Sequence, residues 1–429
     1  MAEPRSAARK QLKAAAESAK YQKEWFKGLR ARVEAGEPLA YINADVPMEL
    51  LRAMDVNYVV NQWWSAICGA KQLAPRYLPL LEKAGFRSDL CSYCATALGE
   101  SLDSEDASVG PWGGLPSPTM AITRLACDCQ GKIFSLFAKN HGAALHTMEN
   151  SSPRKLPVNW WELAQDNWEA LYDKDRLDMA VAELRELAEF VERECGHKFS
   201  EDRLAEVMAL TDKQESWYRK TRDLIADTSP APVSVVDTIN AVMQAQWHRG
   251  TRWAADHAAG LYREVEALAA NGHAAAPNEK YRLMWLGRGL WHDFSFYQNF
   301  EESYGAVFTW SMYLAMGADA YLRSGYEKDP LRALAARYIG LEDFLHCPPW
   351  NSQWFLKEAK RNHIDGVVYM APENCTQAVE GTHFIVKTLE EAGIPVLLFR
   401  ADPVDSRKWS RERMSDEVSR FIETRVRNA

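Results

Sequence analysis

MAITRLAC DCQGKIFSLFAKNHG AALHTME, residues 120–149, alternates between two kinds of sequence pattern. Residues 120–127 and 143–149 are short apolar runs, which are typical of buried strands. Residues 128–142 between them have the composition of a helix that ends at a glycine. A strand, a helix and a strand in succession predict two parallel strands joined by a crossover helix. We therefore expect an α/β domain with a parallel sheet.

The same alternation recurs on both sides of this segment. Upstream, the apolar runs at 39–44 and 56–61 predict strands, and residues 46–54 between them have helical spacing with Pro47 in the first turn. Downstream, further apolar runs predict strands at 281–287, 306–313, 364–371 and 394–402. Helices are expected to follow the last two of these, at 375–391 and 409–427.

Two other regions lack strand patterns. Residues 4–36 are rich in Ala, Lys and Arg with few helix breakers, which predicts one long N-terminal helix. Residues 160–228 and 233–272 are charged and have helical spacing, so we expect a helical region in the middle of the chain.

These patterns predict an α/β fold with two flavodoxin-like, doubly wound parallel-sheet subdomains, an added helical region and an N-terminal helix. The expected boundaries are 1–38 for the N-terminal helix, 39–155 for the first α/β subdomain, 156–275 for the helical region and 276–429 for the second flavodoxin-like subdomain.

The composition excludes several classes of protein. The 429 residues are 47% hydrophobic and 26% charged, with a formal net charge of −8. This is ordinary globular composition, and the negative charge argues against a dedicated nucleic-acid binder. There is no signal-peptide pattern, and no apolar run reaches the ~18 residues of a membrane helix. We expect a soluble, cytoplasmic protein with no nucleic-acid or membrane partner.

Tryptophan is abundant, with 16 residues. Many tryptophans are expected in large hydrophobic cores or at a subunit interface. They are also expected around an aromatic-lined substrate cavity.

Common nucleotide-binding and hydrolase motifs are missing. Gly287-Arg288-Gly289 follows an expected strand, but it lacks the third glycine of a dinucleotide fingerprint, and Trp291 and His292 stand where a helix would pack closely. The chain has no P-loop, no G-x-S-x-G elbow and no H-E-x-x-H pair, so we do not expect it to hydrolyse ATP itself.

Three cysteines share one predicted context. Cys91 follows Ser88 and Asp89, either of which can cap a helix, Cys127 separates an expected strand from the next helix, and Cys375 follows a later strand. Helix N-termini favour thiolates, and ligands bind at the carboxyl ends of parallel strands. Three thiolates there could hold three corners of an iron–sulfur cluster and leave the fourth iron open to water or substrate.

Spacing alone is also consistent with other interpretations of the eight cysteines. Each can be a small buried hydrophobic residue. Cys91 and Cys94 with Cys127 and Cys129 could form a four-thiolate zinc or cluster site, although Cys-x-Cys spacing is poor for zinc. Single histidines are expected to be structural rather than metal ligands: His146, His292, His346 and His363.

Several segments then form one ordered series: VPMELLRAM (46–54), DLCSYCATALGE (89–100), LACDCQGK (125–132), DGVVYMAPENC (365–375) and GIPVLLFRADPVD (393–405) followed by RERMSDEVSRFIE (411–423). In this order and spacing, from about residue 39 to 425, the chain resembles the 2-hydroxyacyl-CoA dehydratase and benzoyl-CoA reductase subunit family.

The resemblance implies a pair of related subunits, each holding a [4Fe–4S] cluster by three cysteines, here matched by Cys91, Cys127 and Cys375. It implies an acyl-CoA substrate and a separate ATP-hydrolysing activase that donates low-potential electrons. In the dehydratases one electron reduces the thioester carbonyl to a ketyl radical that expels hydroxide, and in the reductases the aromatic ring is reduced. Alternatively, the chain is a cluster-free partner subunit that scaffolds or gates such a complex.

The resemblance also implies a catalytic carboxylate. Glu49 matches a P-x-E element and would handle protons near the acyl group, although it could equally be a carboxylate that stabilises a helix N-terminus. Asp55 replaces a frequent glycine, and Cys94 and Cys129 are additional thiols. These departures leave open the acyl-CoA and whether the chain binds substrate or relays electrons. The tryptophan content favours an aromatic acyl group.

Overall fold

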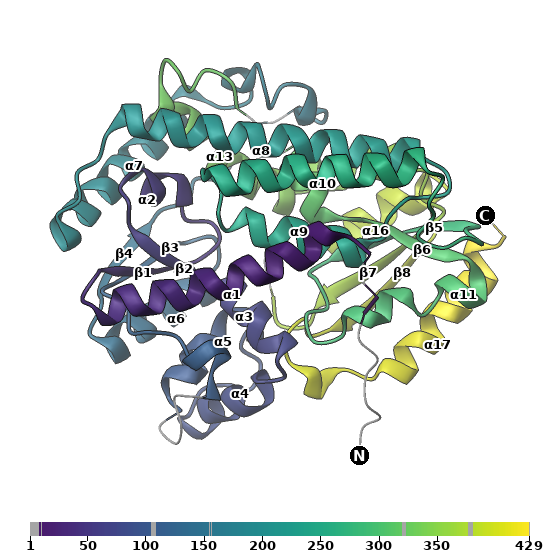
Figure 1. The fold of residues 1–429 in the computed structure, drawn as a ribbon, viewed down its shortest axis with the longest axis horizontal. Helices are drawn as coiled ribbons and strands as arrows, with labels where there is room; N and C mark the ends of the chain where they lie inside the picture. Colours follow the sequence, from purple (N-terminus) through teal and green to yellow (C-terminus); the bar gives the residue numbers. More distant parts are fainter. Residues whose placement is uncertain are drawn as a thin grey trace.

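The computed structural model describes residues 8–9, 11–103, 109–153, 155, 157–319, 323–375 and 381–428. Their strands form two four-stranded sheets, and every neighbouring pair of strands is parallel. The first sheet lies at the left of Figure 1 and the second at the right. The predicted fold class, two doubly wound parallel sheets with added helices, is confirmed.

The two sheets have the same strand order, β2-β1-β3-β4 in the first and β6-β5-β7-β8 in the second. All eight strands fall on predicted runs: β1 (Leu39–Ile42), β2 (Asn57–Val60), β3 (Met120–Arg124), β4 (Ala144–Met148), β5 (Tyr281–Gly287), β6 (Ala306–Ser311), β7 (Gly366–Pro372) and β8 (Val396–Ala401). Every residue of β1, β3 and β7 is buried, whereas the edge strands β4 and β8 include exposed residues. Strands covered on both faces need continuous apolar runs, which explains why the sequence predicted them well.

A layer of helices connects the two sheets. It consists of α1 (Lys13–Glu34), α7 (Lys174–Cys195), α8 (Glu201–Asp227), α9 (Val235–Gln246) and α10 (Arg252–Ala270). In Figure 1, α8 and α10 lie side by side above both sheets, and α1 crosses in front. α8 packs on α2 (Met48–Ala53) of the first half and on α12 (Met312–Asp319) of the second half. The helical region therefore connects the two halves.

Three helices of the second half are absent from the sequence prediction. They are α12, α13 (Pro330–His346) and α14 (Trp350–Arg361). Nearly every residue of α13 is buried, so the helix has no polar face and its apolar residues show no helical period. The strand expected at 306–313 ends at Ser311, because Met312 begins α12.

The helices that were predicted near the two ends of the chain are partly confirmed. α1 begins at Lys13, and residues 1–7 and 10 lie outside the described residues. The helix expected at 375–391 is described as α16 (Thr382–Glu391), because residues 376–380 are not among the described ones. α17 (Arg411–Phe421) and a π-helical turn at Ile422–Val426 cover the last predicted helix. In the part of the chain that the structure describes, no helix has both the length and the apolar content to cross a membrane.

The topology creates one crevice in each sheet. β1 has β2 on one side and β3 on the other, and β5 lies in the same way between β6 and β7. The chain first crosses to the strand on one side of the central strand and then to the strand on its other side. In open α/β sheets, ligands bind in the crevice that forms at such a point, beyond the carboxyl ends of the strands. Here the crevices lie at the ends of β1 and β3 in the first sheet and of β5 and β7 in the second.

Candidate active site

A cavity of about 90 Å³, which we call the thiol cavity, is lined from both crevices. Asp45 follows β1, Cys127 follows β3, Arg288 follows β5 and Cys375 follows β7, and all four line it. Segments that are far apart in the sequence meet here because parallel strands present their carboxyl ends at one edge of a sheet.

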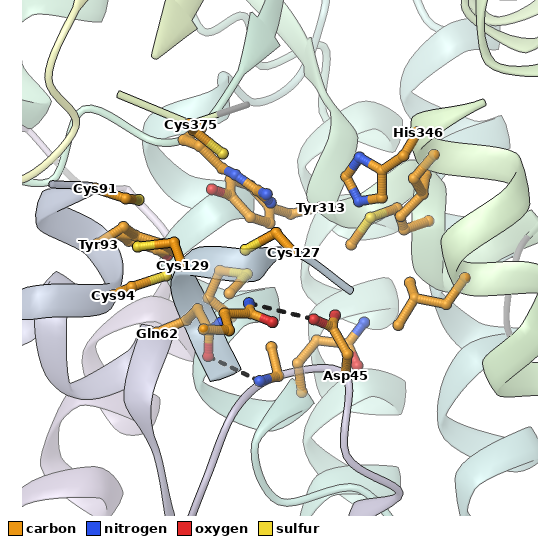
Figure 2. Close-up of a pocket in the computed structure, with 18 of the residues that line it drawn as sticks. Asp45, Gln62, Cys91, Tyr93, Cys94, Cys127, Cys129, Tyr313, His346 and Cys375 are labelled. Carbon is orange, nitrogen blue, oxygen red and sulfur yellow. Dashed lines mark hydrogen bonds between the residues drawn. The ribbon is translucent and has the colours of Figure 1, made fainter. Parts of the chain in front are cut away.

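Cysteines from three segments lie around this cavity (Figure 2): Cys91, Cys94, Cys127, Cys129 and Cys375. Cys91 is itself the N-cap residue of α5 (Ser92–Ser101), in place of the expected Ser88 or Asp89, and Cys127 is the N-cap residue of α6 (Asp128–His141). Both cysteines thus lie at helix N-termini, as predicted. Cys375 follows β7, and the helix start predicted at this position lies outside the described residues. The structure thus brings the three predicted cluster ligands to one cavity.

The thiols also contact one another. Cys91 is hydrogen-bonded to Cys375 and Cys94, and Cys94 is hydrogen-bonded to Cys127 and Cys129. Cys94 is only 5% exposed and occupies the centre of this series. The two additional thiols are therefore part of the same site.

These contacts change the acidity of the thiols. Hydrogen bonds from the thiols of Cys375 and Cys94, together with backbone N–H groups, hold the pKa of Cys91 well below the usual thiol range. The thiol of Cys94 also lowers the pKa of Cys127, whereas the pKa of Cys94 itself is raised. The cavity thus stabilises thiolates at Cys91 and Cys127, and the thiolate is the form of cysteine that binds iron.

The arrangement does not support the zinc alternative. Among the described residues, no group of three or more His, Cys, Asp or Glu side chains is placed to hold a single metal ion. A zinc ion needs four sulfurs at about 2.3 Å from one centre. An iron–sulfur cluster instead takes each thiolate on a different iron, so thiols distributed around a cavity suit it better.

Polar side chains lie across the cavity from Cys91 and Cys94 (Figure 2). Burial raises the pKa of Asp45, which accepts a hydrogen bond of 2.9 Å from the amide of Asn43. Burial, together with the nearby Arg288, lowers the pKa of His346 to about 3. This wall therefore carries a carboxyl group that retains its proton more readily than usual and an imidazole that is neutral near pH 7.

Arg288 contributes a cation that the sequence patterns did not predict. At the preceding Gly287, φ is +110°, and an added Cβ would lie 2.2 Å from the carbonyl oxygen of Met370. The glycine thus lets the chain turn closely past β7, and the indole of Trp285 fixes the turn by donating to the Arg288 carbonyl at 2.8 Å. The signal in the sequence is Gly-Arg-Gly after a strand, which the interpretation as a nucleotide motif left without a role.

Comparison with known proteins supports the resemblance. Residues 43–424 match the family described as 2-hydroxyglutaryl-CoA dehydratase, D-component. The chain belongs to this family. The resemblance stated from the motifs, and the expectation of an enzyme subunit, are confirmed.

Several relatives match this member of the D-component family over most of its length. The (R)-2-hydroxyisocaproyl-CoA dehydratase alpha subunit of Clostridioides difficile is 22% identical over 400 residues, which cover 91% of this chain and 90% of the relative. The (R)-phenyllactyl-CoA dehydratase alpha subunit of Clostridium sporogenes is 23% identical over 403 residues, with 92% and 91% covered. A benzoyl-CoA reductase subunit of Thauera aromatica is 24% identical over 360 residues, with 80% and 78% covered.

Glu49 does not line the thiol cavity of this family member. It is fully buried, accepts hydrogen bonds from Arg249 at 2.9 Å and Tyr338 at 2.7 Å, and pairs with Arg337 at 3.1 Å. Burial opposes ionisation, but these partners outweigh it and lower the pKa of Glu49 to about 2. These are the surroundings of a structural ion pair, and the proton-handling role stays a prediction.

The tryptophans are divided between the buried core and the wall of a second cavity. Four of them are fully buried in the core: Trp64, Trp160, Trp285 and Trp354. Trp63, Trp247 and Trp291 line a second cavity of about 770 Å³, which we call the aromatic cavity. It shares Tyr93, Met243 and Trp247 with the thiol cavity, so the two cavities are neighbours.

Proposed function

We propose that the chain is the iron–sulfur subunit of a heteromeric enzyme that performs low-potential, single-electron chemistry on a CoA thioester. The observation that carries this proposal is the convergence of Cys91, Cys127 and Cys375 on one cavity. The enzyme class is supported by the relatives, whose names describe acyl-CoA dehydratases and a benzoyl-CoA reductase.

The donor set fits a [4Fe–4S] cluster. Cys91, Cys127 and Cys375 would each hold one iron, and a bound cluster would supply single electrons at low potential. Arg288 lies close enough to Cys375 for that thiol to raise the pKa of its guanidinium, so it would offset the negative charge of the thiolates.

Other residues of the cavity would bind substrate and move protons. Met243, Met316 and Leu341 form apolar walls that would exclude water and strengthen the interactions inside. Asp45 lies within the cavity and its pKa is raised by burial, so it is suited to give a proton to a leaving group and to take one back. The neighbouring aromatic cavity favours an aromatic acyl group.

Two protein partners belong to the proposal. A paralogous second subunit is supported by the names of the relatives, each of which is described as one subunit of its enzyme. A separate activase would hydrolyse ATP and deliver the electrons, because this chain lacks a P-loop.

Iron analysis tests the proposal. The chain would be co-expressed with its neighbouring paralogue and purified without oxygen, and about four irons with matching acid-labile sulfide per chain are expected, with visible absorption that bleaches on reduction. Cys375→Ala should lose this iron together with activity on acyl-CoA thioesters. Unchanged iron and full activity in that variant would overturn the site. No iron in the wild-type complex would favour the cluster-free scaffolding or gating role.

A further inference from the structure

Cys94 has no role in the proposed set of three cluster ligands, although it lines the thiol cavity. It is the third residue of α5, and its backbone N–H donates to the carbonyl oxygen of the N-cap residue Cys91 at 3.0 Å. Residues three apart on a helix are neighbours on its surface, so the first turn of α5 fixes the thiol of Cys94 beside that of Cys91. The residue is only 5% exposed, which keeps this thiol away from bulk water.

Helix packing brings the same thiol to a second proposed ligand. α5 packs against α6, whose N-cap residue is Cys127 and whose first turn contains Cys129. Cys94 is hydrogen-bonded to Cys91, Cys127 and Cys129. One buried thiol therefore contacts two of the three proposed ligands, one at the start of each helix.

The direction of these hydrogen bonds follows from the chemistry of iron binding. A cysteine binds iron as a thiolate, which has no proton and can only accept a hydrogen bond. In the contacts with Cys91 and Cys127, the hydrogen must therefore come from Cys94. A thiol has a single proton, so the two sulfurs share one donor.

Backbone groups donate to the same sulfurs. Cys91 accepts from the backbone N–H groups of Tyr93 and Cys94, and Cys127 accepts from that of Gln130. Hydrogen bonds to the sulfurs are among the factors that set the reduction potential of an iron–sulfur cluster. The side chain of Cys94 adds a donor to this set that a single substitution can remove, which a backbone N–H does not allow.

Resting on the proposed function, we propose that Cys94 is a positioning residue that stays a thiol, does not bind iron, and donates to the sulfurs of Cys91 and Cys127. Reduction of a bound cluster adds one negative charge to the site. A donor to the ligand sulfurs stabilises this more negative form, so it raises the reduction potential. Cys94 thus makes the cluster easier to reduce by the electrons that the proposed activase delivers.

A redox titration followed by EPR tests this role without turnover. The iron-loaded complex, purified without oxygen, would be reduced stepwise in the wild type and in Cys94→Ala and Cys94→Ser, which differ from each other by one hydroxyl donor. At a fixed potential, the ratio of reduced to oxidised cluster should be about tenfold lower in Cys94→Ala than in the wild type, which is ~59 mV for one electron. Cys94→Ser should recover part of this difference.

Cys129→Ala is the matched control. Cys129 lines the same cavity and is hydrogen-bonded to Cys94, so this variant removes a neighbouring thiol and keeps the donor. Its reduction potential should equal that of the wild type. A cluster in the second subunit would titrate separately and should not shift in any variant. Proton ENDOR adds an independent measurement, since Cys94→Ala should lose one exchangeable proton that is coupled to the reduced cluster.

The iron content decides which proposal an outcome concerns. An iron-free wild-type complex would refute the proposed function itself. If Cys94→Ala retains about four irons per chain and the wild-type potential, the donor role is overturned. If mild oxidation removes one iron from Cys94→Ala but not from the wild type, Cys94 is a fourth ligand, which also overturns it.

A second pair of variants covers the case in which Cys94→Ala binds no iron. Cys94→Thr and Cys94→Val have nearly the same size and differ by one hydroxyl, so Cys94→Thr should have the higher reduction potential. If none of the four substitutions at Cys94 allows the chain to bind iron, Cys94 is required to hold the cluster, and the inference is wrong.

Discussion

Cys127 and Cys375 occupy corresponding positions in the two sheets. Each lies three residues beyond the strand that borders its crevice, Cys127 after Arg124 of β3 and Cys375 after Pro372 of β7. The two sheets have the same strand order, so this correspondence brings one thiol from each half to the thiol cavity. Neither half alone supplies the three proposed ligands.

Substitution of either residue should therefore release the cluster. We expect Cys127→Ala and Cys375→Ala to retain only a small fraction of wild-type iron, because each variant leaves two of the three proposed thiolates. Iron and acid-labile sulfide per chain, measured on protein purified without oxygen, check this. Cys129→Ala is the matched control, since Cys129 lines the same cavity and is hydrogen-bonded to Cys94. Iron loss in Cys129→Ala with retention in Cys127→Ala would exchange the two assignments.

Cys94 should control the reactivity of its neighbours in iron-free protein. Its thiol donates to Cys91 and Cys127 and lowers the pKa of both. Cys94→Ala removes these hydrogen bonds, so the pH midpoint for alkylation of Cys91 and Cys127 by iodoacetamide should move upward. Peptide mass spectrometry measures the rate at each residue. Cys68→Ala, at a buried cysteine outside the cavity, should leave both midpoints in place.

The sequence predicts those parts of the site that depend on a local pattern of residues. β3 and β7 are buried on both faces, so their apolar runs were visible, and the cysteines that follow them could be placed at the sheet edge. Arg288 was missed for a different reason. Its importance depends on its place in a cavity that segments from both halves of the chain line together. No local spacing encodes which distant segments meet in the fold.

Glu49→Gln should destabilise the protein. The substitution removes the charge that pairs with Arg249 and Arg337 inside the core. Loss of one partner of a buried pair costs about 3–5 kcal/mol, because the remaining charges are left uncompensated. Urea unfolding near pH 7 measures the loss, and Glu417→Gln, at an i,i+4 pair on the surface whose arginine is 67% exposed, should change the free energy of unfolding by less than about 0.5 kcal/mol. A loss of activity with unchanged stability would instead favour the catalytic role.

The effect of Glu49→Gln should also depend on pH. The pKa of Glu49 is lowered from 4.5 to about 2 in the folded chain, so its ionisation stabilises the fold above pH 4.5. This contribution is lost as the pH falls from 4.5 toward 2, where the folded state also takes up the proton. The difference in unfolding free energy between wild type and variant should therefore be largest near neutral pH and shrink below pH 4.5. A difference that is constant down to pH 3 would contradict the ion-pair role.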